Sequence, residues 1–171
     1  GNLYCTLPGN TSGEPILFSA HMDTVVPGVG VKPVIEDGVI RSSGDTVLGG
    51  DDKSGIAAIV EALRTIVEQN LPHPTIEALF TVCEEVGLRG SQHMDYSRIT
   101  AKKAAVLDSS GDAGKIITAA PGQYKLSAAV IGRRAHAGVA PEEGISAVQV
   151  LSEAIANMKL LRIDEETTAN I

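Results

Sequence analysis

The sequence of 171 residues contains no tryptophan and only 3% aromatic residues, which leaves little for stacking on bases or sugars. Basic residues are also scarce, because 14 Lys and Arg stand against 21 Asp and Glu, a net charge of −7. This balance disfavours nucleic acid and anionic membranes as partners, and it suits a site that gathers divalent cations. No apolar stretch approaches the roughly 20 residues that span a bilayer. We therefore expect neither a nucleic-acid nor a membrane partner.

Cysteine is scarce as well, with Cys5 and Cys83 only. Two cysteines do not make a disulfide framework, and no signal peptide is visible, so we predict a reducing, cytoplasmic location. The chain begins without methionine inside a strand-like run at residues 2–7, and residues 168–171 at its end have the pattern of a strand beginning. We therefore predict that the chain is a fragment of a longer protein.

The first part of the chain alternates apolar runs with helical patterns. An apolar repeat at every third or fourth position predicts a helix at residues 54–70, and a shorter helix is predicted at 87–96. Residues 31–41 have the pattern of a small hairpin. Three short apolar runs predict strands: a buried one at residues 15–20, a second at 75–83 with apolar residues alternating on one side, and a third at 103–107. This order predicts an α/β domain with a mostly parallel sheet and flanking helices over residues 1–111.

The pattern changes after the Ser- and Gly-rich segment at residues 109–114. Two strands are predicted at residues 116–120 and 124–131, and a helix at 145–158. Strands followed by a helix, without tight βα alternation, indicate the first half of a second, α+β domain over residues 112–171.

Polar residues stand where the apolar runs end, which is where sheet enzymes collect their ligands. His21 ends the first buried run, and Asp23 lies two positions later, on the same side of an extended chain. Asp23 is thus placed to accept the second ring N–H of a metal-binding His21. The alternative is a capped turn in which Asp23 accepts a backbone N–H.

Asp51 and Asp52 follow a Gly-Gly pair at the start of the long helix. Acidic residues favour a helix start, so N-capping is one interpretation. A phosphate loop requires glycine directly before Lys-Ser, where Asp52 stands, and two carboxylates would repel phosphate. The glycines fit better with a backbone that comes close to a metal centre.

Glu84 and Glu85 end the second apolar run, and Asp108 ends the third. Adjacent side chains of an extended segment diverge, so one glutamate can bind a metal while the other reaches the water, as general-base chemistry requires. A solvated glutamate pair and a turn-forming Asp108 are the alternatives. Cys83, beside the glutamates, is interpreted as a buried strand residue.

His136 lies in a turn of small residues before the last helix, where it is either a substrate contact or an ordinary loop histidine. His93, Met94 and Asp95 repeat the letters of residues 21–23, but they follow no apolar run, and we interpret this as coincidence.

Taken in order, these motifs resemble peptidase T and its relatives, the two-zinc exopeptidases and deacylases that include aminoacylase and succinyl-diaminopimelate desuccinylase. The resemblance covers essentially the whole chain. It rests on five segments: His21-Met22-Asp23-Thr24-Val25, Gly49-Gly50-Asp51-Asp52-Lys53, Glu84-Glu85-Val86-Gly87, Asp108 and Ala135-His136-Ala137-Gly138.

The resemblance implies a set of metal ligands. Asp51 bridges two zinc ions, and the Asp51–Asp52 peptide is expected to be cis. His21 and Asp108 complete one zinc, and Glu85 binds the other. Cobalt or manganese could occupy the same ligands.

The resemblance also implies other roles. Glu84 is expected to be the general base, Asp23 to orient His21, and His136, on a lid domain, to bind the substrate or polarise its carbonyl, in some relatives from a neighbouring subunit. The implied reaction is hydrolysis of peptide bonds in short peptides, of the tripeptide aminopeptidase type, and a homodimer through the lid domain is an open alternative to a monomer.

The sequence departs from the family in one respect: the second zinc takes a further histidine from far downstream, and no histidine follows His136. We therefore expect this chain to bind the second metal weakly and to hydrolyse little. An N-acyl amino acid deacylase or carboxypeptidase of the same superfamily is the alternative within the enzyme class. Outside that class, a metal-binding, non-catalytic relative is the alternative.

Overall fold

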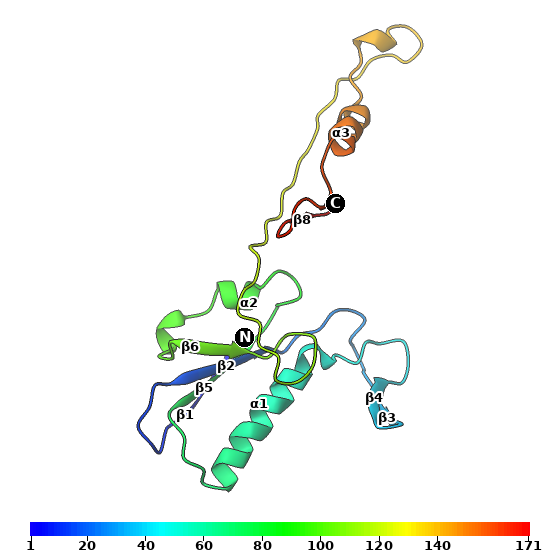
Figure 1. Cartoon of the computed structure of the whole chain (residues 1–171). Helices are drawn as coiled ribbons and strands as arrows, with labels where there is room; N and C mark the ends of the chain where they lie inside the picture. The colour runs from blue at the N-terminus through cyan, green and yellow to red at the C-terminus, as the bar shows by residue number, and fades with distance from the viewer. The chain divides into compact units, whose positions relative to one another are not determined.

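A computed structural model describes residues 1–171, which form two units, Gly1–Ala113 and Gly114–Ile171. The first unit contains a four-stranded sheet in the order β1-β5-β2-β6 (Figure 1). Its strands are β1 (Leu3–Leu7), β5 (Ile76–Thr81), β2 (Ile16–His21) and β6 (Lys103–Val106). A separate hairpin joins β3 (Pro33–Glu36) to β4 (Val39–Ser42). The three predicted strands and the predicted hairpin are thereby confirmed, although β6 is mostly exposed.

Parallel pairing sets the geometry of this sheet. β2 runs parallel to β5, with His21 opposite Thr81, and parallel to β6, with Ser19 opposite Val106. β1 alone is antiparallel, against β5. The sheet is thus mostly parallel, as predicted, and the carboxyl ends of β2, β5 and β6 meet at one edge. Every residue of β5 is buried, as expected for an inner strand covered on both faces.

The long helix α1 (Gly50–Glu68) packs against β2. Ile59 joins Ala20, Ala78 and Phe80 in the buried core because apolar residues recur along one side of the helix. The predicted helix at 54–70 is therefore confirmed, although its first residues lie earlier than the apolar pattern suggests. No helix of the chain is both long enough and apolar enough to cross a membrane.

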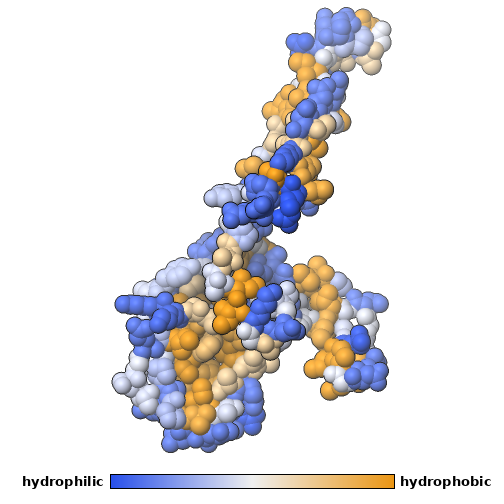
Figure 2. Space-filling model, in the orientation of Figure 1, coloured by the Kyte–Doolittle hydropathy of each residue, from blue (hydrophilic) through white to orange (hydrophobic).

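An apolar hollow of about 400 Å³ opens between β1 and α1, and Figure 2 shows hydrophobic residues gathered on this face of the first unit. Its lining residues come from the two elements: Cys5, Thr6, Leu7, Leu63, Arg64, Val67 and Glu68.

After β5 the chain forms only short helical turns, α2 (Arg89–Gln92) and a 3-10 helix, η1 (Tyr96–Arg98), in place of one helix over 87–96. Gly90 packs so closely against Val82 that a side chain at this position would collide with the Val82 carbonyl. The turn is therefore held close to the end of β5.

The second unit contains η2 (Pro141–Glu143), α3 (Ala147–Ala156), β7 (Leu161–Arg162) and β8 (Thr168–Ala169). α3 confirms the predicted helix, and its N-cap Ser146 accepts a hydrogen bond from the Gln149 amide. The strands predicted at 116–120 and 124–131 are wrong.

The reason for this difference is the lack of a pairing partner. A strand needs a neighbouring strand that pairs with its N–H and C=O groups. Near residues 116–131, the only backbone pairing of this kind is the isolated bridge between Arg133 and Ile145. Tyr124, Leu126 and Ile131 are each more than 90% exposed. The β-forming pattern is present in the sequence, but the pairing that would use it is not.

Asp52 caps the regular part of α1. The backbone angles of Asp51 and Asp52 are not helical, and the Oδ1 of Asp52 accepts a hydrogen bond from the Gly55 amide at 3.1 Å. Asp52 is only 2% exposed. The N-capping interpretation therefore applies to Asp52, while Asp51 precedes the regular part of α1. The peptide between the two residues is cis, as the resemblance implies.

Gly55 allows this cap to form because nothing larger than hydrogen fits beside it. A Cβ at this position would lie 2.6 Å from the Leu107 carbonyl oxygen and closer still to the Asp52 carboxylate.

Replacement of a helical glycine by alanine ordinarily stabilises a protein by about 1 kcal/mol. Here we expect Gly55→Ala to destabilise by about 1–3 kcal/mol, because backbone must move. Urea unfolding measures this, with the exposed Glu61→Ala as the control; a variant as stable as wild type would contradict it.

Glu77 in β5 is a buried acid, 5% exposed, that holds the chain before β6. Its carboxylate accepts hydrogen bonds from the amide and hydroxyl of Thr100, at 2.9 and 2.6 Å, and from the Ala101 amide at 3.1 Å. Burial alone would raise the pKa of Glu77, but these donors outweigh it and hold the pKa below its ordinary value.

Because an amide side chain cannot accept all of these bonds, we expect Glu77→Gln to lower the free energy of unfolding by about 1–3 kcal/mol at pH 7. The folded-state pKa of Glu77 is lowered, so its contribution is present above the unfolded pKa of about 4.3 and is lost as the pH falls through the folded value. The difference between wild type and variant should therefore shrink below about pH 4 in urea unfolding series. A pH-independent difference would contradict this account. Glu61→Gln, on the exposed face of α1, is the control.

Candidate metal centre

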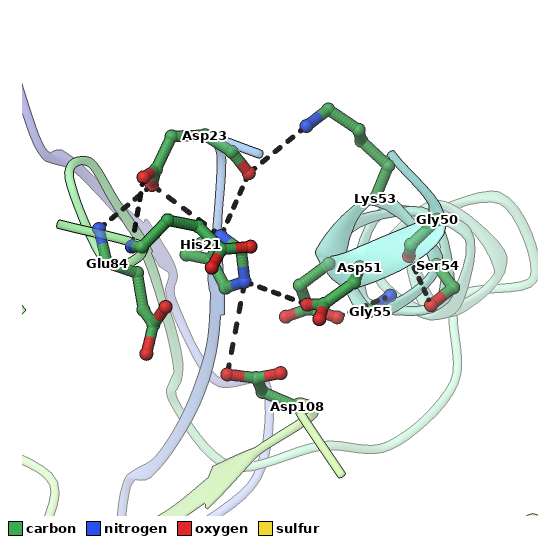
Figure 3. Close-up of polar contacts among 11 residues, drawn as sticks. His21, Asp23, Gly50, Asp51, Lys53, Ser54, Gly55, Glu84 and Asp108 are labelled. Atoms are coloured by element: carbon green, nitrogen blue, oxygen red, sulfur yellow. Dashed lines mark hydrogen bonds and ion pairs between the residues drawn. The ribbon is translucent and has the colours of Figure 1, made fainter. Parts of the chain in front are cut away.

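Strand ends deliver the polar residues of the candidate site to one edge of the sheet (Figure 3). His21 is the last residue of β2, and Asp108 follows β6 by two positions. Glu84 and Glu85 follow β5, and Asp51 lies in the turn before the regular part of α1. The residues that the sequence singles out in the first unit thus lie together.

His21 is the buried centre of this group, with 3% exposure. Its Nδ1 lies 2.9 Å from the backbone carbonyl of Asp23, an atom that only accepts, so Nδ1 carries a proton. Its Nε2 lies 2.9 Å from Oδ1 of Asp51 and 4.0 Å from Oδ2 of Asp108. The Nε2 atom therefore faces carboxylates, while Nδ1 is held by the main chain.

The surrounding acids determine the charge of His21. Burial by itself lowers the pKa of His21, but the hydrogen bond that the ring donates to Asp51 and the negative charges of Asp108 and Glu84 outweigh it, so the pKa is raised. In the protonated form of His21, the proton on Nε2 lies at the point where a metal ion would bind. Such a histidine binds a cation in place of that proton.

Three residues present ligand atoms close enough to share one ion. Single donor atoms of His21, Asp51 and Glu85 all lie within 4.8 Å of one another. Imidazole nitrogen and carboxylate oxygen are the donors that zinc uses in catalytic sites. The donor set therefore fits a divalent transition metal, and Asp108 lies beside it.

The electrostatics of the carboxyl groups agree with this fit. Burial and the nearby charge of Asp51 raise the pKa of Asp108. Burial also raises the pKa of Glu84; His21 opposes this, and Asp108, Glu85 and Asp23 add to it. Like charges held this close favour protonation, and a bound dication would relieve their repulsion.

Asp23 is placed differently from the sequence interpretation. The ring N–H of His21 donates to the backbone carbonyl of Asp23, whereas the nearer carboxylate oxygen is 3.5 Å away. The carboxylate accepts instead from the amides of Glu84 and Glu85, at 3.0 and 3.2 Å. The chain turns after β2, so the two-residue alternation of a strand no longer applies. The Asp23 carboxylate therefore accepts backbone N–H groups, as the alternative interpretation proposed. The donors, however, lie 61 and 62 positions further along the chain and not in the same turn.

No contact is predicted for Lys53 from the sequence, in which it appears only as part of the motif at residues 49–53. Its Nζ donates to the same Asp23 carbonyl at 3.2 Å (Figure 3). Its side chain passes close to Gly49, which has a positive φ of 73°. The only signal in the sequence is its place directly after the Asp51–Asp52 pair.

Two predictions for other residues have different outcomes. Cys83 is exposed and has a φ of 56°, so its interpretation as a buried strand residue is wrong; β5 ends at Thr81 and the chain turns there. His136 lies in the second unit, exposed, with Nδ1 accepting from the Gly138 amide at 3.2 Å. Its role as a substrate contact stays a prediction.

Known proteins resemble this chain along its whole length. Bacillus subtilis YqjE is 56% identical over 171 residues, which are all of this chain and 46% of that protein. The crystal structure of aminopeptidase PepT from Bacillus cereus matches 99% of the chain with 50% identity and a TM-score of 0.82. A tripeptidase from Staphylococcus aureus matches 99% with 37% identity and a TM-score of 0.81. The chain spans 46% of each of these two structures, about half the length of its relatives.

These matches agree with the resemblance to peptidase T and with the mixed α/β fold. The match to a family model extends through the first unit and into the second, over residues 2–142. This segment includes every residue of the candidate centre and His136 as well. The chain therefore belongs to peptidase family M28.

Proposed function

We propose that this chain is part of a metal-dependent aminopeptidase that hydrolyses peptide bonds in short peptides, such as tripeptides. The observation that carries the proposal is the convergence of His21, Asp51 and Glu85 at one edge of a mostly parallel sheet. Two relatives are an aminopeptidase and a tripeptidase, which supports this substrate class.

The ligand set that we propose uses the carboxyl ends of three strands and one turn. Asp51, whose side chain is 73% exposed, would supply a carboxylate to both metal ions. His21 and Asp108 would help to hold one ion, and Glu85 would help to hold the other. Two zinc ions, when bound, polarise the scissile carbonyl and lower the pKa of water.

Glu84 is the general base in this proposal. It is adjacent to Glu85 but has a separate environment, in which burial and neighbouring acids raise its pKa. A raised pKa brings a carboxylate closer to the operating pH, where it can take a proton from water and return it to the leaving amine. His136 is assigned to substrate binding, from the second unit.

Zinc binding by the 171-residue chain is the first test. We expect zinc to raise the free energy of unfolding by about 2.7 kcal/mol at a hundredfold excess over its dissociation constant. His21→Ala should abolish this zinc-dependent increase, whatever it does to the metal-free protein. The matched control is His93→Ala, because His93 is exposed and stands in the same His-Met-Asp letters. An equal zinc response in wild type and His21→Ala would refute the metal centre.

The general base is tested in the complete enzyme, at the length of its relatives. We expect Glu84→Gln to lower kcat for a tripeptide with a free amino terminus by about 10²–10⁴-fold while metal content stays the same. Glu85→Gln should instead reduce metal content. Hydrolysis rates and metal analysis of both variants make the comparison. If Glu84→Gln loses metal as Glu85→Gln does, then Glu84 is a ligand and the assignment is wrong.

A further inference from the structure

Asp23 contacts three of the four segments that carry the candidate centre. Its carbonyl oxygen accepts from Nδ1 of His21 at the end of β2 and from Nζ of Lys53 at the start of α1. Its carboxylate accepts from the amides of Glu84 and Glu85 after β5. The two functional groups of one residue thus serve different segments, with its side chain 26% exposed.

We propose that the carboxylate of Asp23 is a positioning group for Glu84 and Glu85, and that the orientation of His21 is left to the Asp23 carbonyl. This inference rests on the proposed function, in which Glu85 is a ligand and Glu84 a base. The partners of the Asp23 side chain are then the two glutamate amides and not the imidazole ring of His21.

The backbone around the two glutamates explains why they need such a partner. Cys83 and Gly87 have positive φ angles of 56° and 99°, so the chain turns on both sides of the pair. The carbonyl of Glu84 is used inside the turn, where it accepts from the amides of Gly87 and Leu88 at 2.9 Å each. The amides of Glu84 and Glu85 have no sheet neighbour and point together at the Asp23 carboxylate. Consecutive amides in a turn form such an anion-binding pair.

The energetics favour this role over a role at the ring. Hydrogen bonds to an ionised acceptor are roughly twice as strong as neutral ones. The Asp23 carboxylate lies 3.0 and 3.2 Å from the amide nitrogens of Glu84 and Glu85, whereas its nearer oxygen lies 3.5 Å from Nδ1 of His21. A displacement of about 1 Å in such a turn can cost 10²-fold in rate.

Amide hydrogen exchange of the metal-free chain tests the contact directly. We expect Asp23→Asn to speed exchange at Glu84 and Glu85 by about tenfold or more, because one amide loses its charged acceptor and the other meets an NH2 group. The His21 ring should keep its proton on Nδ1, as seen by nitrogen NMR. Asp95→Asn is the matched control, since the Asp95 carboxylate accepts from the Ser97 amide at 3.1 Å, far from the centre in sequence. A changed His21 ring with unchanged exchange at residues 84 and 85 would overturn the proposal.

A second measurement uses the unmodified protein, so that it holds even if Asp23→Asn does not fold. A through-hydrogen-bond coupling between the Glu84 amide nitrogen and the Asp23 carboxyl carbon is expected. If such couplings are resolved within α1 but not here, the proposal is wrong.

Zinc affinity then separates a positioning role from a merely structural one. We expect Asp23→Asn to weaken zinc binding about 10- to 100-fold in the wild-type background, as loss of groups supporting a ligand does. In the Glu85→Ala background the same change should weaken it less than about threefold, because Asp23 acts through Glu85. Equal losses in both backgrounds would contradict the proposal. If the wild-type chain binds no zinc, the proposed function fails, whereas the exchange measurement still decides the contact.

Discussion

Parallel pairing of β2 with β5 and β6 is the constraint on which the candidate centre depends. It brings three strand ends to one edge, and each strand continues into a segment that carries an acid or a histidine. Apolar packing of β2 and β5 against α1 stabilises this arrangement. Without it, the carboxyl groups near His21 would separate to reduce their mutual repulsion. The hydrophobic core therefore stabilises a local concentration of charge that is unfavourable by itself.

The acids of the first unit fall into two classes by the groups that face them. Asp23 and Glu77 face amide N–H groups from distant segments, and both have lowered pKa values. Glu84 and Asp108 face other acids, and their pKa values are raised. The first class organises the chain, and the second contains the groups to which the proposed function assigns metal and proton chemistry. Asp52 has features of both classes. Its Oδ1 caps α1, as an acid of the first class would. Its buried Oδ2 has no hydrogen-bond partner, and burial and the charge of Asp108 raise the pKa of Asp52, as in the second class.

The sequence predicts those parts of the fold and the site that depend on local pattern. Apolar runs locate the strands, and their ends locate His21 and Asp108, because parallel strands bring their carboxyl ends together. The pattern fails where the outcome depends on distant partners. The β-forming segments at 116–120 and 124–131 remain unpaired, and no local signal marks that.

Contacts at turns are equally hard to predict. The alternation rule places the Asp23 carboxylate beside the ring of His21, but the chain leaves the strand after His21, and the carbonyl takes that place. The partners of the carboxylate lie more than 60 positions away, where Cys83 adopts a positive φ. To predict such a contact, one must know the backbone path of both the turn after β2 and the turn after β5. Neither apolar periodicity nor residue type gives that path.

The two units differ in how far their structure can support chemistry. The first has a buried core, and the three donors of the candidate centre, His21, Asp51 and Glu85, all belong to it. The second contains no buried residue, and the chain spans about half the length of its relatives. In the proposed function, the residues of this chain that would hold metal therefore all belong to the first unit. His136, which the proposal assigns to substrate binding, belongs to the second unit. Substitutions in different units thus test these two proposed roles separately.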